Sequence, residues 1–403
     1  MTAAVALMLW QAAAAVPGLA TPGEVGMLLD QLGDADLVLM NDPRAGQPAR
    51  VLLATRVRAP AEQVRQVLAT PASYGKAMPA FRRVATATRR ARSDGGTDLE
   101  VAWELDIPLW NLKGKLWLRP RADGVDLELA EGDLAPGLFH LTARPAAGDT
   151  SERTLLIVEG VANVRDANLA TRQLAQRSPL AEPAMTLAAA YVMLKSLAGL
   201  AEDGQGRRPS ATLAAPEATR LDSAAIAGAV LVQPPRRVLL AAVRSLQNGR
   251  LADVEVAGLV SARAGQRAVA NLRPERFRSL PGWKKVELES ANPDTCQDPG
   301  AVCWVVENNL PVFSLDGTWK IRPRPWRARM VAGEREGALM GVDVVSSKTS
   351  NGVAMVLMEH PRLDRAGYMA RKLIAAEPYL EHGLALALTV VEAASLVAAL
   401  ERD

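Results

Sequence analysis

Side chains that could move protons are few in this chain and are not grouped. The 403 residues include three histidines, His140, His360 and His382. None lies in a Gly-rich phosphate loop, in a nucleophile elbow or at a spacing typical of metal ligands. His382 follows Glu381 at the start of an expected helix, where we predict a surface or capping role in place of a general base. The pattern therefore indicates no catalytic residue, no metal and no cofactor.

One acid and one base recur at the same spacing in two places. Glu159 is followed by Arg165, and Glu359 is followed at the same distance by Arg365. Each pair falls near the junction of a strand and a helix, and we interpret it as a structural ion pair. The alternative is a polar anchor for the headgroup of a bound ligand.

The two cysteines are close enough in sequence to be joined. Cys296 and Cys303 flank Asp298-Pro299-Gly300, a turn signal that would bring two strands together. A disulfide that closes so small a loop would stabilise the fold by roughly 2–3 kcal/mol, and two free thiols are the alternative. Two thiols without a nearby histidine supply too few ligands for a metal site. The predicted disulfide is typical of an exported protein.

The N-terminal segment is apolar. Residues 3–15 carry no charge, and Gly18-Leu19-Ala20 places small residues where a signal peptidase would cut. The usual basic region is missing, so a buried N-terminal helix is the alternative. No other stretch reaches the roughly 18 apolar residues of a membrane span. We expect a signal peptide over residues 1–20 and a periplasmic or secreted protein, with a cytoplasmic one as the alternative.

Charge does not select a polyanionic partner. The chain has 47 Lys and Arg against 44 Asp and Glu, a net charge of +3, and no basic tract stands out. Nucleic acid is therefore not an expected partner. The hydrophobic content of 49% is ordinary for a globular protein that buries sizeable cores.

These residues are distributed over two copies of one unit. Residues 108–114 (PLWNLKG) and 311–317 (PVFSLDG) are separated by 203 positions, and an Arg-Pro-Arg step follows each. Farther along, we align Glu159 with Glu359 at an offset of 200, which implies three residues lost from a loop. The polar segment 203–223 separates the copies. We therefore predict domains over residues 21–202 and 224–403, joined by a linker over residues 203–223.

Each copy begins with a strand, two short helices and more strands. Residues 51–57 alternate as a strand, a helix is predicted from Pro60 to about Leu68, and a helical turn follows over Pro71 to Lys76. Alternating strands come next. Their polar face, which includes Arg119 and Arg121, is expected to be solvated.

A long helical stretch over about residues 167–202 closes the unit, interrupted near Pro179 and Pro183. Four apolar positions form one stripe on it that should face the sheet. They are Leu187, Tyr191, Leu194 and Ala198. The order of elements predicts an α+β fold in which an antiparallel sheet wraps around a C-terminal helix.

This order of elements, the Pro79-Ala80-Phe81-Arg82-Arg83-Val84 step after the short helices and the long closing helix resemble the helix-grip superfamily. It includes START lipid-transfer domains, polyketide cyclases and coenzyme Q-binding proteins. The resemblance covers about residues 47–202 and 252–401. It implies two helix-grip domains, each a curved antiparallel sheet around a long C-terminal helix, and a cavity for a lipid, sterol, isoprenoid or polyketide.

If the apolar face of each sheet points inward, aromatic and aliphatic side chains line both cavities. Those of the first copy are Trp103, Trp110, Leu112, Leu116 and Leu118, with Tyr191 from the closing helix. Those of the second copy are Trp304, Phe313, Leu315, Trp319 and Ile321. Such walls suit an apolar ligand. The alternative is that these side chains simply fill the core.

The function that this pattern favours is binding or transport of a hydrophobic small molecule. A transient membrane contact is a further expectation. The enzymatic alternative is a two-domain polyketide aromatase/cyclase, which needs polar groups inside the cavity, whereas the assigned inward positions are nearly all apolar. A third hypothesis is a module with filled cores whose outer faces bind a partner protein.

Overall fold

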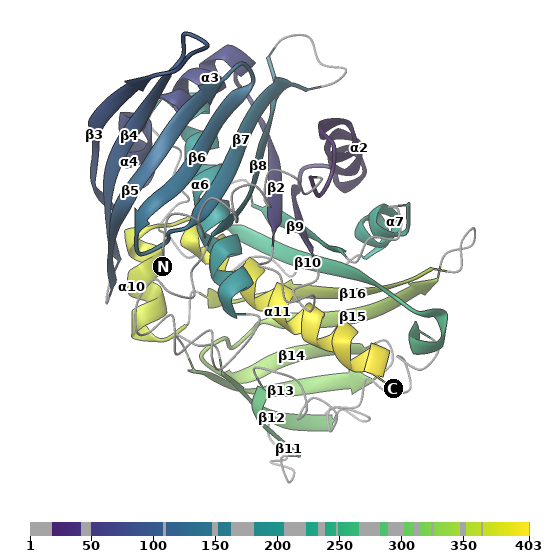
Figure 1. Cartoon of the computed structure of the whole chain (residues 1–403). Coiled ribbons are helices and arrows are strands. Elements are labelled where there is room, and N and C mark those ends of the chain that lie inside the picture. Colours follow the sequence, from purple (N-terminus) through teal and green to yellow (C-terminus); the bar gives the residue numbers. More distant parts are fainter. Residues whose placement is uncertain are drawn as a thin grey trace.

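The fold is an antiparallel sheet with helices on both faces (Figure 1). In the computed structural model, the sheet has sixteen strands in the described part of the chain. The structure describes residues 18–41, 50–107, 110–146, 152–162, 181–204, 223–232, 238–246, 249–265, 283–288, 302–309, 314–323, 326–346, 352–363 and 366–402.

The first half of the chain runs from a short helix through eight strands to a long helix. Its elements are α2 (Pro22–Leu32), β1 (Asp36–Asn41), β2 (Val51–Val57), α3 (Ala61–Ala69), α4 (Pro71–Ala77), β3 (Phe81–Ala91), β4 (Thr97–Ile107), β5 (Trp110–Arg121), β6 (Gly124–Gly132), β7 (Gly137–Pro145), β8 (Thr154–Ala162) and α6 (Ala181–Asp203). The predicted strand and both short helices are confirmed, with Pro60 as the N-cap of α3.

In the described residues, the second half repeats the order of the strands and of the first and last helices. Its elements are α7 (Ala224–Val232), β9 (Val238–Ser245), β10 (Leu251–Val260), β11 (Trp283–Leu288), β12 (Val302–Asn309), β13 (Ser314–Pro323), β14 (Trp326–Gly333), β15 (Leu339–Ser346), β16 (Val353–His360), α10 (Tyr368–Ala376) and α11 (Leu380–Arg402). Residues 205–222 of the predicted linker lie outside the described residues, as do residues 167–180 of the predicted closing helix.

The two halves join through their first strands. The strand order is β11-β12-β13-β14-β15-β16-β10-β9-β1-β2-β8-β7-β6-β5-β4-β3, with β1 antiparallel to β9 at the centre. Val38 lies opposite Ala241, 203 positions later in the sequence. Because these are equivalent positions of the repeat, a local two-fold axis passes between them. The chain thus has the symmetry of a dimer joined by edge strands.

Three layers form at this centre. Helices α6 and α11 pack on one face of the sheet, and α2 and α7 pack on the other face (Figure 1). The two long helices also touch each other: a Cβ on Gly383 of α11 would lie 2.8 Å from the carbonyl oxygen of Ala188 in α6. Glycine at residue 383 therefore allows the helices their close approach.

The predicted stripe on the long helix is confirmed as core. Leu187, Tyr191 and Leu194 are fully buried, and Ala198 is nearly so. By length and composition, α6 and α11 could each cross a membrane, but 72% and 78% of their most apolar windows are buried inside the described protein. Such burial is expected of core helices that a sheet covers.

Four further elements, α2, β1, α7 and β9, were not predicted from the sequence pattern. Helix α2 begins with a capping box in which Thr21 and Glu24 satisfy each other's backbone N–H groups. Just before it, the N–H of Leu19 donates to Oε1 of Glu159 over 2.8 Å, and Leu19 and Ala20 pack against the core. Cleavage after Ala20, the predicted signal-peptidase position, would remove this contact.

The pairing register corrects the repeat alignment. In the first half, Val51 of β2 pairs with Gly160 of β8, and its equivalent Val254 of β10 pairs with Glu359 of β16. Glu359 therefore corresponds to Gly160, at an offset of 199, and the predicted match with Glu159 is wrong by one residue. Since successive strand residues point to opposite faces, the two glutamates lie on opposite faces of the repeat unit.

A glycine in β5 gives a test of this packing. Gly114 lies opposite Trp103, and a Cβ there would come within 2.3 Å of the Glu131 carbonyl oxygen and 2.8 Å of the indole. We expect Gly114→Ala to destabilise the protein by about 2 kcal/mol. Gly26→Ala, on α2 with nothing within 4 Å, should instead stabilise by up to about 1 kcal/mol. Urea unfolding followed by circular dichroism measures both, and equal stabilities would contradict the close contact.

Candidate functional site

We call inner the face of each half-sheet that packs on its long helix, and outer the opposite face. Val101, Leu118, Leu127 and Leu141 of the first half lie in the same buried cluster as the side chains of α6, which defines its inner face. By the strand pairing, Trp103, Leu112 and Leu116 share this face. The predicted inward direction of the apolar side chains is therefore confirmed for these positions.

Trp103 carries the one polar atom of this apolar wall that lacks a partner within the described residues. Its side chain is 4% exposed, and its Nε1 is buried with no hydrogen-bond partner among them. Gly114 directly opposite leaves room for the ring. Leaving a donor unpaired costs roughly 1–3 kcal/mol, so an acceptor placed there would be favoured.

Toward the free edge of the sheet the inner face is covered only in part, by α4 packed on β3. Val101, Trp103 and Leu118 are 2%, 4% and 1% exposed, whereas six other large apolar residues on the inner face of β3, β4 and β5 are partly exposed. These residues are Phe81, Val84, Leu99, Leu105, Leu112 and Leu116, and we call them the open inner patch. The pairings join them into one surface across β3, β4 and β5.

The remaining predicted lining residues have different positions. Tyr191 is fully buried but donates to a carboxylate at the junction of the two halves. Trp319 and Ile321 are buried on the inner face of the second half. Trp110, Trp304, Leu315 and Cys303 lie on described strands, but their side chains are outside the description; Phe313 and Cys296 lie outside the described residues altogether. The disulfide therefore stays a prediction.

The inner face of the second half contains a buried ion pair. Arg335, between β14 and β15, pairs with Glu359 of β16, and their side chains are 1% and 0% exposed. Thr389 of α11 places its hydroxyl 2.9 Å from Oε2 of Glu359. The guanidinium carbon lies 5.5 Å from the ring centroid of Trp319, a cation–π contact. Arg335 Nε has no hydrogen-bond partner within the described residues.

The first half cannot form such a pair. Its equivalent of Glu359 is Gly160, where a Cβ would already lie 2.5 Å from the ring of Phe139. The two inner faces therefore differ at this position: the first half has a glycine packed on Phe139, and the second half holds two opposite charges. This difference is hidden in the sequence, because Glu359 aligns with Glu159 almost as well as with Gly160 and because Arg335 is 24 residues away in the chain.

The two predicted glutamate sites have partners other than those expected. Glu159 pairs with Arg50, with Nε and Oε1 3.0 Å apart, and Glu359 pairs with Arg335. Arg165 and Arg365, the predicted partners, lie outside the described residues. Glu159 is on the face covered by α2, so it can contribute nothing to the inner face of the first half.

A second buried polar cluster lies where the two halves meet. Asp36 of β1 accepts a hydrogen bond from the Tyr191 hydroxyl over 2.6 Å and pairs with Lys195 Nζ at 3.0 Å. The Thr55 hydroxyl also donates to it. Desolvation raises the pKa of Tyr191 well above its usual value, and the negative charge of Asp36 is the next largest cause. These bonds attach α6 to the central strands.

His382 is buried in this cluster, so the predicted surface or capping role is wrong. Its ring is fully buried and stacks on Tyr191 with the centroids 5.8 Å apart. Nε2 lies 3.1 Å from the Ser245 hydroxyl, and Nδ1 has no partner within the described residues. Desolvation lowers the pKa of His382 to about 3, with a further contribution from Lys195. A neutral imidazole that resists protonation so strongly is a poor general base.

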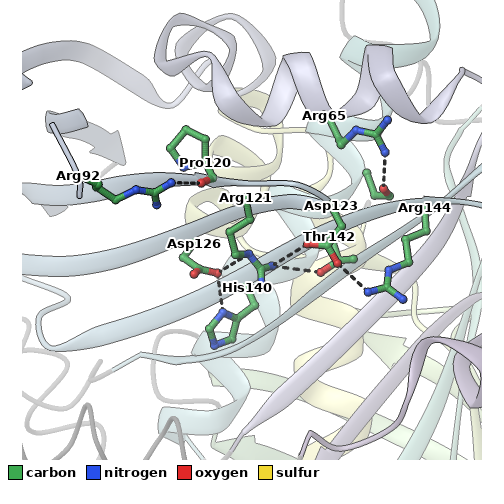
Figure 2. Close-up of polar contacts among 10 residues, drawn as sticks. Arg65, Arg92, Pro120, Arg121, Asp123, Asp126, His140, Thr142 and Arg144 are labelled. Atoms are coloured by element: carbon green, nitrogen blue, oxygen red, sulfur yellow. Dashed lines mark hydrogen bonds and ion pairs between the residues drawn. The ribbon is translucent and has the colours of Figure 1, made fainter. Parts of the chain in front are cut away.

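The outer face of the first half carries a network of charged side chains (Figure 2). Arg121 pairs with Asp126 at 3.0 Å, and His140 Nδ1 lies 2.7 Å from the same carboxylate. Farther along, Arg144 pairs with Asp123 at 2.7 Å. The predicted polar face is thus confirmed, and such surface pairs contribute little individually. Within the described residues no three His, Cys, Asp or Glu side chains are grouped to hold a metal ion.

In each half, a curved antiparallel sheet that packs on its C-terminal helix is the helix-grip arrangement, which confirms the predicted fold class. No protein-family model matches the sequence, and no curated protein is similar to it by sequence. Among solved structures, the chain is similar to a START superfamily protein from Mycobacterium smegmatis, with 16% identity over 28% of this chain and 76% of that one, at a TM-score of 0.24.

Two aromatase/cyclases are also similar. The di-domain protein StfQ of the steffimycin biosynthetic pathway is 12% identical over 83% of this chain and 97% of that one, with a TM-score of 0.26. The Zhui aromatase/cyclase from Streptomyces sp. R1128 is 16% identical over 38% of this chain and 93% of that one, with a TM-score of 0.28. Similarities at this level assign neither ligand nor activity to this chain.

The buried imidazole predicts a stability that falls in acid. In the unfolded chain a histidine has a pKa of about 6.5. Below that pH the unfolded state binds a proton that His382 does not bind in the native state, so the unfolded state is favoured. The contribution of the neutral His382 side chain to the free energy of unfolding is complete above pH 6.5 and is lost progressively toward pH 3. We expect about 2 kcal/mol to be lost between pH 7 and pH 5 on this account. His382→Phe, which preserves the stacking on Tyr191, should lack this loss.

Urea unfolding midpoints at the two pH values measure this difference. Leu386→Ala, which destabilises the same helix without removing a histidine, is the control and should keep the wild-type dependence on pH. A His382→Phe protein that loses as much stability as wild type would contradict the assignment to His382.

The buried ion pair predicts strong coupling between two residues. Arg335→Met leaves the Glu359 carboxylate buried without its cation and should cost about 3–5 kcal/mol of unfolding free energy. Adding Glu359→Leu removes the unpaired charge and should restore most of that loss. A double-mutant cycle by urea denaturation measures the coupling, and additive losses would contradict a mutual pair.

Proposed function

We propose that the protein binds a hydrophobic small molecule with a hydrogen-bond acceptor against the inner face of its first half. The observation that carries the proposal is the open inner patch, an apolar surface left partly exposed on the face that the long helix covers elsewhere. The unpartnered Trp103 N–H beside it supports the acceptor.

The free energy available from such contact is sufficient. Covering roughly 200–300 Å² of apolar surface would contribute on the order of 5–7 kcal/mol before the entropic costs of binding. A hydrogen bond to the buried indole adds about 1 kcal/mol. A lipid, sterol or isoprenoid with a hydroxyl or carbonyl group has the chemistry that this surface would accept.

The second half has a different role in this proposal. Arg335 and Glu359 are paired with each other inside its inner face, and Trp319 packs on the pair. A purely apolar molecule would have to lie against buried charges there, which is unfavourable. We therefore assign ligand binding to the first half and a mainly structural role to the second.

A second candidate function is that of an aromatase/cyclase. It is favoured by the same ion pair, since Arg335, Glu359 and Thr389 are polar groups on an inner face, which sequence analysis did not find. Their mutual bonding and burial argue for a structural pair instead, because a catalytic group must reach its substrate.

Native mass spectrometry of the full chain purified from its expression host, followed by solvent extraction, is the test. We expect a co-purifying apolar molecule. The same spectra report whether residues 1–20 and two hydrogens have been lost, as the proposed export and disulfide require. A ligand-free chain with no affinity for an apolar probe would contradict the proposed function.

Substitutions on the inner face test where the ligand binds. With 11-(dansylamino)undecanoic acid as a fluorescent probe, Trp103→Phe should weaken binding about two- to tenfold, because it removes the donor and keeps the ring. Leu116→Lys should abolish binding, because it introduces a charge into the open inner patch. Trp117→Phe, the neighbouring position on the outer face, is the matched control and should bind normally. Equal weakening by Trp103→Phe and Trp117→Phe would exclude this location.

A further inference from the structure

The free edge strand β3 concentrates positive charge. Residues 82–92 (RRVATATRRAR) contain five arginines and no acidic residue, in pairs too widely spaced to stand out as a tract in sequence analysis. The strand places them along one edge of the sheet, where β4 is the only strand paired with β3 in the described part of the chain. We call Arg82, Arg83, Arg89 and Arg90 the β3 arginines.

Most of this charge is uncompensated. All four β3 arginines are exposed, and Arg83, Arg89 and Arg90 form no ion pair within the described residues. Arg82 comes only to 3.8 Å from Glu104. The fifth arginine, Arg92, is occupied by Asp94 at 3.1 Å and by Asp98 at 3.4 Å.

Two acids on the neighbouring strand are already engaged by other cations. On β4, Asp98 is shared between Arg92 and Arg119, and Glu100 pairs with Lys115. Arg90 lies opposite Asp98 in the register without forming a pair. The positive field of the edge is therefore available to a partner outside the chain.

The geometry of the strand argues against a peptide partner. Its register shifts twice, between Phe81 and Arg83 and again between Thr86 and Thr88. Such bulges disrupt the regular row of backbone groups that an added strand would need. The arginines also lie on both faces of the sheet. In the strand register Arg83 is opposite Glu104, which is on the outer face, and Arg89 is opposite Leu99, which is on the inner face.

Two apolar side chains of the same strand complete the surface. Phe81 and Val84 belong to the open inner patch and are partly exposed beside the arginines. Cationic side chains on both sides of an edge with apolar groups between them match a bilayer surface, where anionic headgroups lie above acyl chains.

We propose that the β3 edge docks on an anionic lipid surface, with the β3 arginines against the headgroups and the open inner patch turned toward the bilayer. The proposal rests on the proposed function, because it provides the route by which an apolar molecule reaches the inner face. Each arginine near an anionic surface strengthens binding about fivefold, so removing three should weaken it by on the order of 100-fold.

Co-flotation with vesicles tests the docking. Wild-type protein should bind vesicles of phosphatidylcholine with 30% phosphatidylglycerol, should lose binding as salt is raised, and should not bind pure phosphatidylcholine. The variant Arg83→Glu/Arg89→Glu/Arg90→Glu should lose this binding. The variant Arg58→Glu/Arg263→Glu/Arg371→Glu changes the charge equally at three exposed arginines elsewhere and should bind nearly as wild type.

The outcomes separate the two proposals. Retained binding of the dansylated fatty acid by the β3 variant, with vesicle binding lost, supports the docking edge. Equal vesicle binding by wild type and the β3 variant would overturn it while leaving the ligand site intact. Preferential binding of a 20-nucleotide single-stranded DNA would overturn the proposal of a lipid partner. Self-association of the β3 variant without loss of vesicle binding would also overturn it, because the arginines would then serve to prevent pairing of the free sheet edge with other chains.

Discussion

The antiparallel pairing of β1 with β9 is the contact on which the rest of the structure depends. It turns two copies of one unit into a single sheet and buries the first strand of each copy at the centre. Without it each half would expose a central edge to solvent and to other chains. The pairing also brings α2 beside α7 on one face and α6 beside α11 on the other, so three layers are stabilised together.

Polar groups at this junction hold the layers in register. Asp36 of β1 receives hydrogen bonds from Tyr191 and Lys195 of α6, and His382 of α11 stacks on the same tyrosine. Buried groups of this kind are costly unless paired, so each one penalises any arrangement that separates the helices from the central strands. The polar bonds at the junction therefore favour one arrangement of the helices on the central strands, which apolar contacts alone would not specify.

The symmetry of the backbone does not extend to the inner faces. Where the second half has Glu359 bonded to Arg335, the first has Gly160 against Phe139. A duplicated unit that has diverged in this way can keep one copy stable while the other retains an uncovered apolar surface. The open inner patch and the unpartnered Trp103 N–H lie in the copy without the Arg335–Glu359 pair, next to an edge rich in arginine.

Local patterns in the sequence were enough to predict the repeat, the strand over residues 51–57, the two short helices and the buried stripe of α6, because periods of two and 3.6 residues reflect burial directly. They could not determine which side chains meet across the fold. An offset of 200 and one of 199 look almost alike in sequence, yet one residue reverses the face to which a glutamate points. The bonds from Asp36 to Tyr191 and from Arg335 to Glu359 join elements whose approach only the strand order decides, and His382 is buried because two halves of the chain close over it.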